Sequence, residues 1–220
     1  IKPKILINAT AYNFVDKAEI YQDIAFDTNS TAVENIAKCM KKIGGYFIHF
    51  STNYVFNGFK KKPYSEADKT DPINIYGQSK LSGERKIENL LDNYFIFRTS
   101  GVIGRHGNNF ATNILNSIRF NNELNVVDDQ FIVPTSTSLI SKVINDCINQ
   151  IKKGDPWEPG IYNLTPKGKS NWFEISNYII EIAFKKNLPF IFEEIKVNPI
   201  MTFESPDKAK RPKYSLLDIS

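Results

Sequence analysis

The sequence predicts an α/β fold built on a doubly wound parallel sheet, and two patterns carry this prediction. Short apolar runs rich in β-branched and aromatic residues, typical of strands buried on both faces, recur along the chain. Longer segments with apolar side chains at helical spacing lie between them. Strands and helices that alternate in this way form right-handed crossover units, which place the strands parallel in one sheet.

The first half of the chain supplies most of the predicted sheet. Its apolar runs predict buried strands, and the segments between them carry an apolar stripe on one helix face. The clearest stripe ends at Gly44 and Gly45, which are typical of a helix end. The expected strands are residues 4–9, 46–50 and 94–100, and the expected helices are residues 16–19, residues 29–43 and a helix that carries Tyr76.

The second half mixes further strands and helices with irregular segments. Residues 153–156 have the composition of a linker, and the proline-containing tail after Pro199 is expected to be irregular. Ser170 is expected to cap the helix that follows it. The expected strands are residues 124–127, 160–165 and 190–197, and the expected helices are residues 108–121, 137–152 and 170–186.

Composition narrows the range of partners. With 41% hydrophobic and 24% charged residues in 220, the chain is typical of a folded globular protein. The net charge of +4 is spread along the chain, and no apolar run reaches the length of a membrane span, so we expect neither a nucleic-acid nor a membrane partner. Cys39 and Cys147 lack metal-ligand spacing, which indicates no metal site and favours a reduced, cytoplasmic protein.

A group of three residues carries the chemistry that we expect. Tyr76 and Lys80 are four positions apart, so a helix stacks them on one face about one turn apart. A lysine ammonium beside a phenol favours the phenolate and lowers the tyrosine pKa toward the range useful for proton transfer. Thr52, at the end of a predicted strand, could hydrogen-bond the oxygen of a bound carbonyl. The spacing alone is a weak signal, and the strand, loop and helix around it give it weight.

Eight segments, in order along nearly the whole chain, carry a resemblance to a known family. They are residues 7–12 with 15–19, Asn29 with 31–33, residues 51–56, residues 76–81 with Gly83 and Glu84, residues 98–100, residues 107–110, residues 127–130 with Pro134 and Thr135, and residues 211–212 with 214–215. On these segments the chain resembles the extended short-chain dehydrogenase/reductase superfamily, most closely its dTDP-4-dehydrorhamnose reductase branch.

The resemblance implies a fold and a reaction. The fold would be a Rossmann-like doubly wound parallel sheet, N-terminally incomplete, with residues 1–127 as a partial NAD(P)-binding domain and residues 128–220 as a smaller substrate-binding region. The reaction would reduce dTDP-4-dehydro-L-rhamnose to dTDP-L-rhamnose with NADPH, or alternatively NADH, in cell-surface polysaccharide biosynthesis. A Mg²⁺ requirement has no support in this sequence, and a homodimer would be compatible with the family.

The resemblance also implies roles for particular residues. Thr52, Tyr76 and Lys80 would be catalytic, and Asn29 would more often cap a helix than touch a ligand. The residues implied to border the cofactor are Ala9, Ala11, Tyr12, Tyr76 and Lys80, and those implied to line the nucleotide-sugar side are Thr52, Asn53, Ser100, Asn108, Gln130 and Thr135.

Three features depart from the family's pattern. The family opens with a glycine-rich strand, turn and helix that bind a pyrophosphate, whereas the first glycine here is Gly44. About fifty residues of the nucleotide-binding half are therefore expected to be absent. Asn53 stands where the family usually has aspartate, and Gly101 stands where it usually has a tryptophan beside the sugar.

These departures keep other functions open. A nucleotide-sugar dehydratase or epimerase would need acid groups beside Thr52, where Asn53 and Tyr54 stand instead. A non-catalytic regulatory or binding subunit of the same fold would not need the glycine turn, although it would have no use for the intact Tyr76 and Lys80 pair. An inactive truncated fragment is the remaining alternative.

Overall fold

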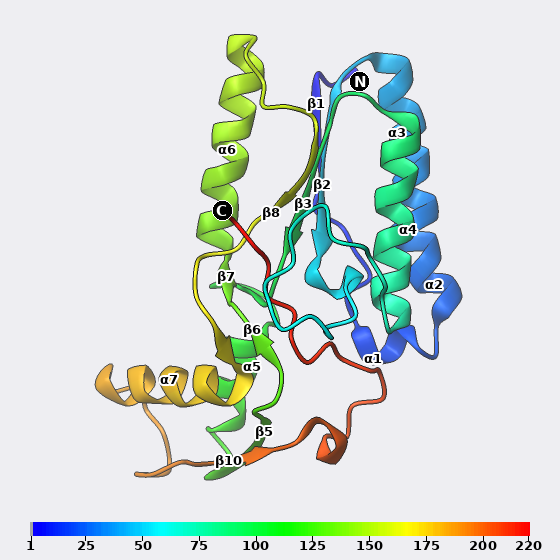
Figure 1. Cartoon of the computed structure of the whole chain (residues 1–220). Coiled ribbons are helices and arrows are strands. Elements are labelled where there is room, and N and C mark those ends of the chain that lie inside the picture. The colour runs from blue at the N-terminus through cyan, green and yellow to red at the C-terminus, as the bar shows by residue number, and fades with distance from the viewer. Residues whose placement is uncertain (1) are drawn as a thin grey trace.

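A parallel sheet with helices on both faces forms the centre of the computed structural model, which describes residues 2–220 (Figure 1). The sheet has the strand order β1-β2-β3-β8, and all its neighbouring strands pair in parallel. Its strands are β1 (Ile5–Asn8), β2 (Tyr46–Thr52), β3 (Tyr94–Thr99) and β8 (Gly160–Asn163). The predicted α/β class with a parallel sheet is confirmed.

Helices α3 (Ala32–Ile43) and α4 (Ile75–Leu90) cover one face of the sheet (Figure 1). The predicted stripe of α3 is buried, because Val33, Ala37 and Met40 pack against Phe47 of β2. Gly44 ends the helix in the left-handed conformation at φ +72°, which glycine adopts without the strain of a side chain.

The segment before α3 is more helical than the sequence indicated. After α1 (Val15–Ala18), the structure has α2 (Gln22–Phe26) and a π-helical turn (Asp27–Thr31). These turns lack a long apolar stripe, and contacts with α4 hold them in place. Ser30 and Ser82 share a 2.7 Å hydrogen bond, and a Cβ on Gly83 would lie 2.2 Å from the carbonyl oxygen of Asn29.

Helix α6 (Thr137–Lys153) covers the other face of the sheet (Figure 1). Its Ile144 and Cys147 pack against Phe95 and Phe97 of β3. The Ser136 hydroxyl accepts a hydrogen bond from the Leu139 amide at the start of the helix, and Gly154 ends it. This helix has nearly the predicted bounds.

A second, smaller layer lies beyond the carboxyl ends of the main strands (Figure 1). In it β5 (Glu123–Val127) pairs in parallel with β10 (Lys196–Ile200), and α5 (Phe110–Ser117) packs near α7 (Trp172–Lys185) around an apolar cluster that includes Ile114, Ile118 and Ile180. The proposed boundary at residue 127 stays a prediction, and both β8 and α6, which follow it in sequence, lie against the main sheet.

Two predictions in this layer were wrong. Asn171, not Ser170, caps α7, because its side-chain oxygen accepts from the Glu174 amide at 2.8 Å while the Ser170 hydroxyl bonds the Glu174 carboxylate. The last strand is residues 196–200 instead of 190–197, because pairing with β5 begins at Lys196. Phe190 instead packs on Phe184, with ring centroids 5.4 Å apart.

The remaining elements are short strand pairs and turns. They are β4 (Val102–Ile103) paired with β7 (Thr135–Ser136), β6 (Phe131–Ile132) paired with β9 (Ser170–Asn171), and 3-10 turns at Asn53–Val55 and Thr202–Glu204. The tail returns to the first layer, where Leu217 forms a β-bridge with Tyr64. Within residues 2–220, no helix combines the length and apolar character that a membrane crossing requires.

Candidate active site

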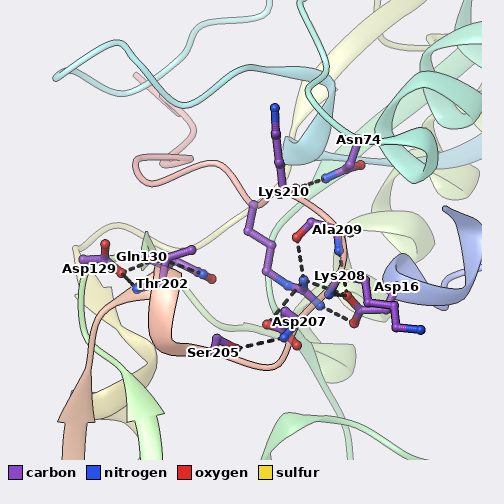
Figure 2. Close-up of polar contacts among 11 residues, drawn as sticks. Asp16, Asn74, Asp129, Gln130, Thr202, Ser205, Asp207, Lys208, Ala209 and Lys210 are labelled. Atoms are coloured by element: carbon purple, nitrogen blue, oxygen red, sulfur yellow. Dashed lines mark hydrogen bonds and ion pairs between the residues drawn. The ribbon is translucent and has the colours of Figure 1, made fainter.

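Thr52 and Tyr76 meet because α4 begins directly against the turn after β2. Asn74 caps α4 by accepting from the Gly77 amide at 2.7 Å, and its side-chain amide donates to the Lys210 carbonyl (Figure 2). Gly77 allows the close approach, since a Cβ there would lie 2.2 Å from the carbonyl oxygen of Tyr54. The Tyr76 ring then packs edge-on against Tyr54, with centroids 6.0 Å apart.

A cavity of about 290 Å³ opens at this junction. Thr52, Asn53 and Tyr76 line it together. A second cavity of about 780 Å³ lies beside it and shares part of its wall. The shared wall residues are Asn13, Val15, Tyr54, Phe110 and Trp172. The structure therefore brings Thr52 and Tyr76 to one cavity wall, and their roles stay predictions.

The Tyr76 hydroxyl is kept protonated in this structure. Burial raises the pKa of Tyr76 to about 12, and an interaction with the Thr52 side chain opposes part of that rise. We expected Lys80 to lower the pKa of Tyr76, and this expectation was wrong, because Lys80 has no effect on that pKa in this structure. The Lys80 amine instead donates to the carbonyl oxygen of Phe50 at 2.6 Å, on the strand beneath α4.

Lys80 lies in the interior beside a buried histidine. Its amine is 3.4 Å from Nε2 of His49, and burial lowers the pKa of Lys80 to about 8. The nearby Glu84 carboxylate counteracts this shift in part, but it is engaged by Arg98 at 3.0 and 2.7 Å. Lys80 is therefore a cation with little compensation, whose charge is costly to hold.

Asn53 links the turn after β2 to Ser100 and to the C-terminal tail by hydrogen bonds. Its amide nitrogen lies 3.0 Å from the Ser100 hydroxyl and 3.0 Å from the Ser215 carbonyl oxygen, and all three residues are buried. An aspartate could not donate to that carbonyl, so in this chain the asparagine is needed for the hydrogen bond to Ser215 in the C-terminal tail. Ser100 thus supports Asn53 and does not line either cavity.

The remaining predicted substrate residues are spread more widely. Gln130 lines the larger cavity and donates to the Thr202 hydroxyl at 3.2 Å (Figure 2). Thr135 is fully buried in β7 and lines neither cavity. Asn108 is exposed and lines neither cavity, whereas its neighbour Asn109 lines the larger one and caps α5. The cap is the local reason that residue 109 points inward.

The segment expected to border a cofactor follows β1. Ala9 and Ala11 are exposed there, and Tyr12 is partly buried. Asn29 accepts from the Tyr12 amide at 2.8 Å and donates to the Tyr12 carbonyl at 2.9 Å. Asn29 therefore fixes the backbone of this segment, and it lies inside the π-helical turn instead of capping a helix.

Sequence reasoning assigned no role in the site to a charged pair in the wall of the larger cavity. Arg211 lines this cavity, and its guanidinium holds the Asp16 carboxylate at 2.7 and 3.1 Å. The same carboxylate accepts from the amides of Lys208 and Ala209 (Figure 2). Both residues stood in the segments that carry the resemblance, yet nothing local pairs residues 195 positions apart.

Trp172 was also missed. It lines both cavities and packs on Phe110, with ring centroids 4.2 Å apart. A Cβ on Gly101 would lie 3.5 Å from the edge of the Trp172 ring, so this indole lies next to the position where a tryptophan was expected. Among residues 2–220 there is no group of three histidine, cysteine, aspartate or glutamate side chains that could hold a metal ion.

Comparison with known proteins identifies relatives across the whole chain. The family model for the RmlD substrate binding domain matches residues 1–220. The dTDP-4-dehydrorhamnose reductase of Escherichia coli K12 is 37% identical over 218 residues, which cover 99% of this chain and 72% of the relative. A spore coat polysaccharide biosynthesis protein, SpsK of Bacillus subtilis, is 34% identical over 216 residues, or 98% of this chain and 71% of the relative.

Solved structures agree with the sequence relatives. A dTDP-4-dehydrorhamnose reductase from Bacillus anthracis, crystallised with NADP, has a TM-score of 0.91 and 34% identity, covering 100% of this chain and 73% of the other. The reductase from Clostridium acetobutylicum has a TM-score of 0.89 and 34% identity, covering 99% of this chain and 72% of the other.

Proposed function

Because the chain belongs to the RmlD substrate binding domain family, that of the dTDP-4-dehydrorhamnose reductases, we propose that the cavity between β2 and α4 is its reducing site. The activity is NADPH-dependent reduction of dTDP-4-dehydro-L-rhamnose to dTDP-L-rhamnose, in the synthesis of dTDP-rhamnose. The observation that carries the assignment of the site is the meeting of Thr52 and Tyr76 at one cavity wall.

The segment after β1 fits a dinucleotide. Residues 9–12 are small or partly exposed, and Asn29 fixes their backbone from behind, which leaves their outer side open. Ala9, Ala11 and Tyr12 would border NADPH, together with Tyr76 and Lys80. When bound, NADPH supplies the hydride that reduces the ketone.

Tyr76 is the proton donor in this proposal. Its raised pKa, about 12, keeps the phenol protonated at neutral pH, so that a proton is ready for the ketone oxygen. The Thr52 hydroxyl lies against Tyr76 and orients the same oxygen by a hydrogen bond. Lys80, one turn further along α4, keeps its amine on the Phe50 carbonyl and is assigned to the cofactor side of the site.

The nucleotide part of the substrate is assigned to the larger cavity. It adjoins the reducing cavity through a common wall that includes Phe110 and Trp172, so one ligand can extend through both. Gln130 and Asn109 supply hydrogen-bonding groups, and the Arg211 guanidinium, which is paired with Asp16 and Asp207, lies in the same wall. The cytoplasm is the proposed location, since Cys39 and Cys147 are both free thiols, as a reducing compartment maintains them.

Replacing the proton donor tests this function. Tyr76→Phe should lower kcat for NADPH-dependent reduction by about 10² to 10⁴, because general-acid catalysis is lost while the ring remains. NADPH affinity, followed by cofactor fluorescence, should stay within a factor of two or so, since only one hydroxyl is removed.

Tyr94→Phe is the matched control. Tyr94 is a partly buried tyrosine at the start of β3, at the opposite end of the sheet from the cavity, and its variant should keep normal turnover. Near-normal turnover by Tyr76→Phe would show that another group donates the proton. Loss of turnover in both variants would indicate general damage to the fold.

A further inference from the structure

A line of hydrogen-bonded polar groups runs from the exposed Thr10, after β1, through the buried Asn8 and His49 to Lys80. The Thr10 hydroxyl donates to the side-chain oxygen of Asn8 at 2.6 Å, and the side-chain nitrogen of Asn8 lies 3.1 Å from Nδ1 of His49. Nε2 of the same ring lies 3.4 Å from the Lys80 amine. Asn8 and His49 are also direct partners in the β1 and β2 pairing, so the backbone fixes their relation.

Counting donors and acceptors settles which ring nitrogen carries the proton. The Asn8 oxygen already accepts from the amide and the hydroxyl of Thr10, at 3.1 and 2.6 Å, so its NH₂ group faces His49. An NH₂ group only donates, so Nδ1 of His49 must accept. A neutral imidazole then carries its hydrogen on Nε2, and burial, which lowers the pKa of His49 well below its usual value, keeps the ring neutral.

This tautomer directs an N–H bond at Lys80. An N–H donor is compatible with a neutral amine, which has a lone pair, and opposes an ammonium, which has none. Neither of the two other ionisable groups on α4 near Lys80 fully stabilises its ammonium form. Tyr76 is a protonated phenol, and the Glu84 carboxylate on the same helix is bound by Arg98 of β3.

We propose that His49 is a positioning residue whose tautomer, set by Asn8, controls the charge of Lys80 and holds its amine against the Phe50 carbonyl. The inference deepens the proposed function, because Lys80 belongs to the proposed catalytic trio. The consequence is a lysine whose amine is neutral in a larger share of molecules than that of an exposed lysine.

Nitrogen-15 NMR of the histidine rings tests the tautomer directly in the full chain. Only His49 and His106 contribute signals, because the chain has 2 histidines, and His106→Gln identifies the other set. The expected spectrum for His49 has an unprotonated Nδ1 and a protonated Nε2 that do not titrate around neutral pH. A proton on Nδ1, or a ring that becomes doubly protonated near neutral pH, would overturn the proposal.

Substitution of Asn8 tests the control of Lys80. In Asn8→Asp the new carboxylate only accepts, so the ring hydrogen should move to Nδ1 and Nε2 should accept from the ammonium. The pKa of Lys80, measured by the carbon-13 shift of its Cε and assigned with Lys80→Arg, should rise by about one unit or more.

A double-mutant cycle separates the effect relayed through the His49 ring from the direct effect of the new carboxylate charge on Lys80. In a His49→Phe background the effect of Asn8→Asp on the Lys80 pKa should fall to less than half, because the ring that relays it is gone. An equal shift in both backgrounds would refute the relay. Lack of turnover by the unaltered chain would count against the proposed function and would leave these NMR results unchanged.

Discussion

The two cavities of this molecule are built in different ways. The reducing cavity takes the two side chains assigned its chemistry, Thr52 and Tyr76, from a strand and a helix that follow each other in the chain, while the rest of its wall comes from segments between Asn13 and Trp172. The larger cavity takes its wall from segments spread between Asn13 and Arg211. Its charged pair joins residues 195 positions apart.

The difference shows which kind of site can be recognised from sequence. A site within one crossover unit has a fixed spacing, because strand, loop and helix positions decide which side chains meet. A site assembled from distant segments has no spacing of its own. A substitution at the reducing cavity should therefore leave ligand binding at the larger one nearly unchanged.

Lys80→Met should disable the reducing cavity and spare the larger one. Loss of the amine removes one member of the proposed catalytic trio, so kcat should fall by about 100-fold or more. Binding of dTDP, measured by calorimetry, should be nearly unchanged, because Arg211 and Gln130 remain. Lys86→Met, at a partly exposed lysine of the same helix that pairs with Glu34, is the control and should keep full turnover. Weaker dTDP binding in Lys80→Met would mean that the two cavities are not independent.

Gly77→Ala should disturb the junction that brings Tyr76 to Thr52. The new Cβ would lie 2.2 Å from the carbonyl oxygen of Tyr54, which is backbone and cannot turn aside. We expect a loss of about 1 to 3 kcal/mol in the free energy of unfolding, measured with urea, and a fall in turnover. Gly160→Ala is a suitable control, because a Cβ there meets no atom within 4 Å. Equal stability of the two variants would contradict the close approach.

Asp16→Asn should weaken the wall of the larger cavity in a pH-dependent way. Arg211 holds the pKa of Asp16 at about 2, below its ordinary 3.8, so this carboxylate adds stability above the ordinary value and loses it as pH falls through about 2. The pair is partly exposed, so the loss at neutral pH should be about 1 kcal/mol. Urea unfolding at neutral pH and near pH 2 should give a difference that is much smaller at the lower pH. A difference independent of pH would exclude the ion pair as its cause.

The main errors of sequence reasoning lay where contacts compete with local preference. The stripe of α3 predicted its helix well, because one face had to be buried. Ser170 and Asn171 are both good caps and both pair with β6, and the cap falls to Asn171 because the Ser170 hydroxyl bonds the Glu174 carboxylate while the Asn171 side chain accepts from the Glu174 amide. In the same way, pairing with β5 placed the last strand six residues later than its apolar run suggested.

By itself, the sequence determined the parallel α/β plan, the family, and the spacing that brings Thr52 and Tyr76 to one cavity. These depend on short-range periodicity and on one crossover unit, which the order of residues specifies directly. The tertiary structure alone decided which partner each buried polar group found. It placed Lys80 on the Phe50 carbonyl beside His49, and Arg211 on Asp16. A hydrogen bond or ion pair acts across a few ångströms, and only the folded chain brings distant residues that close.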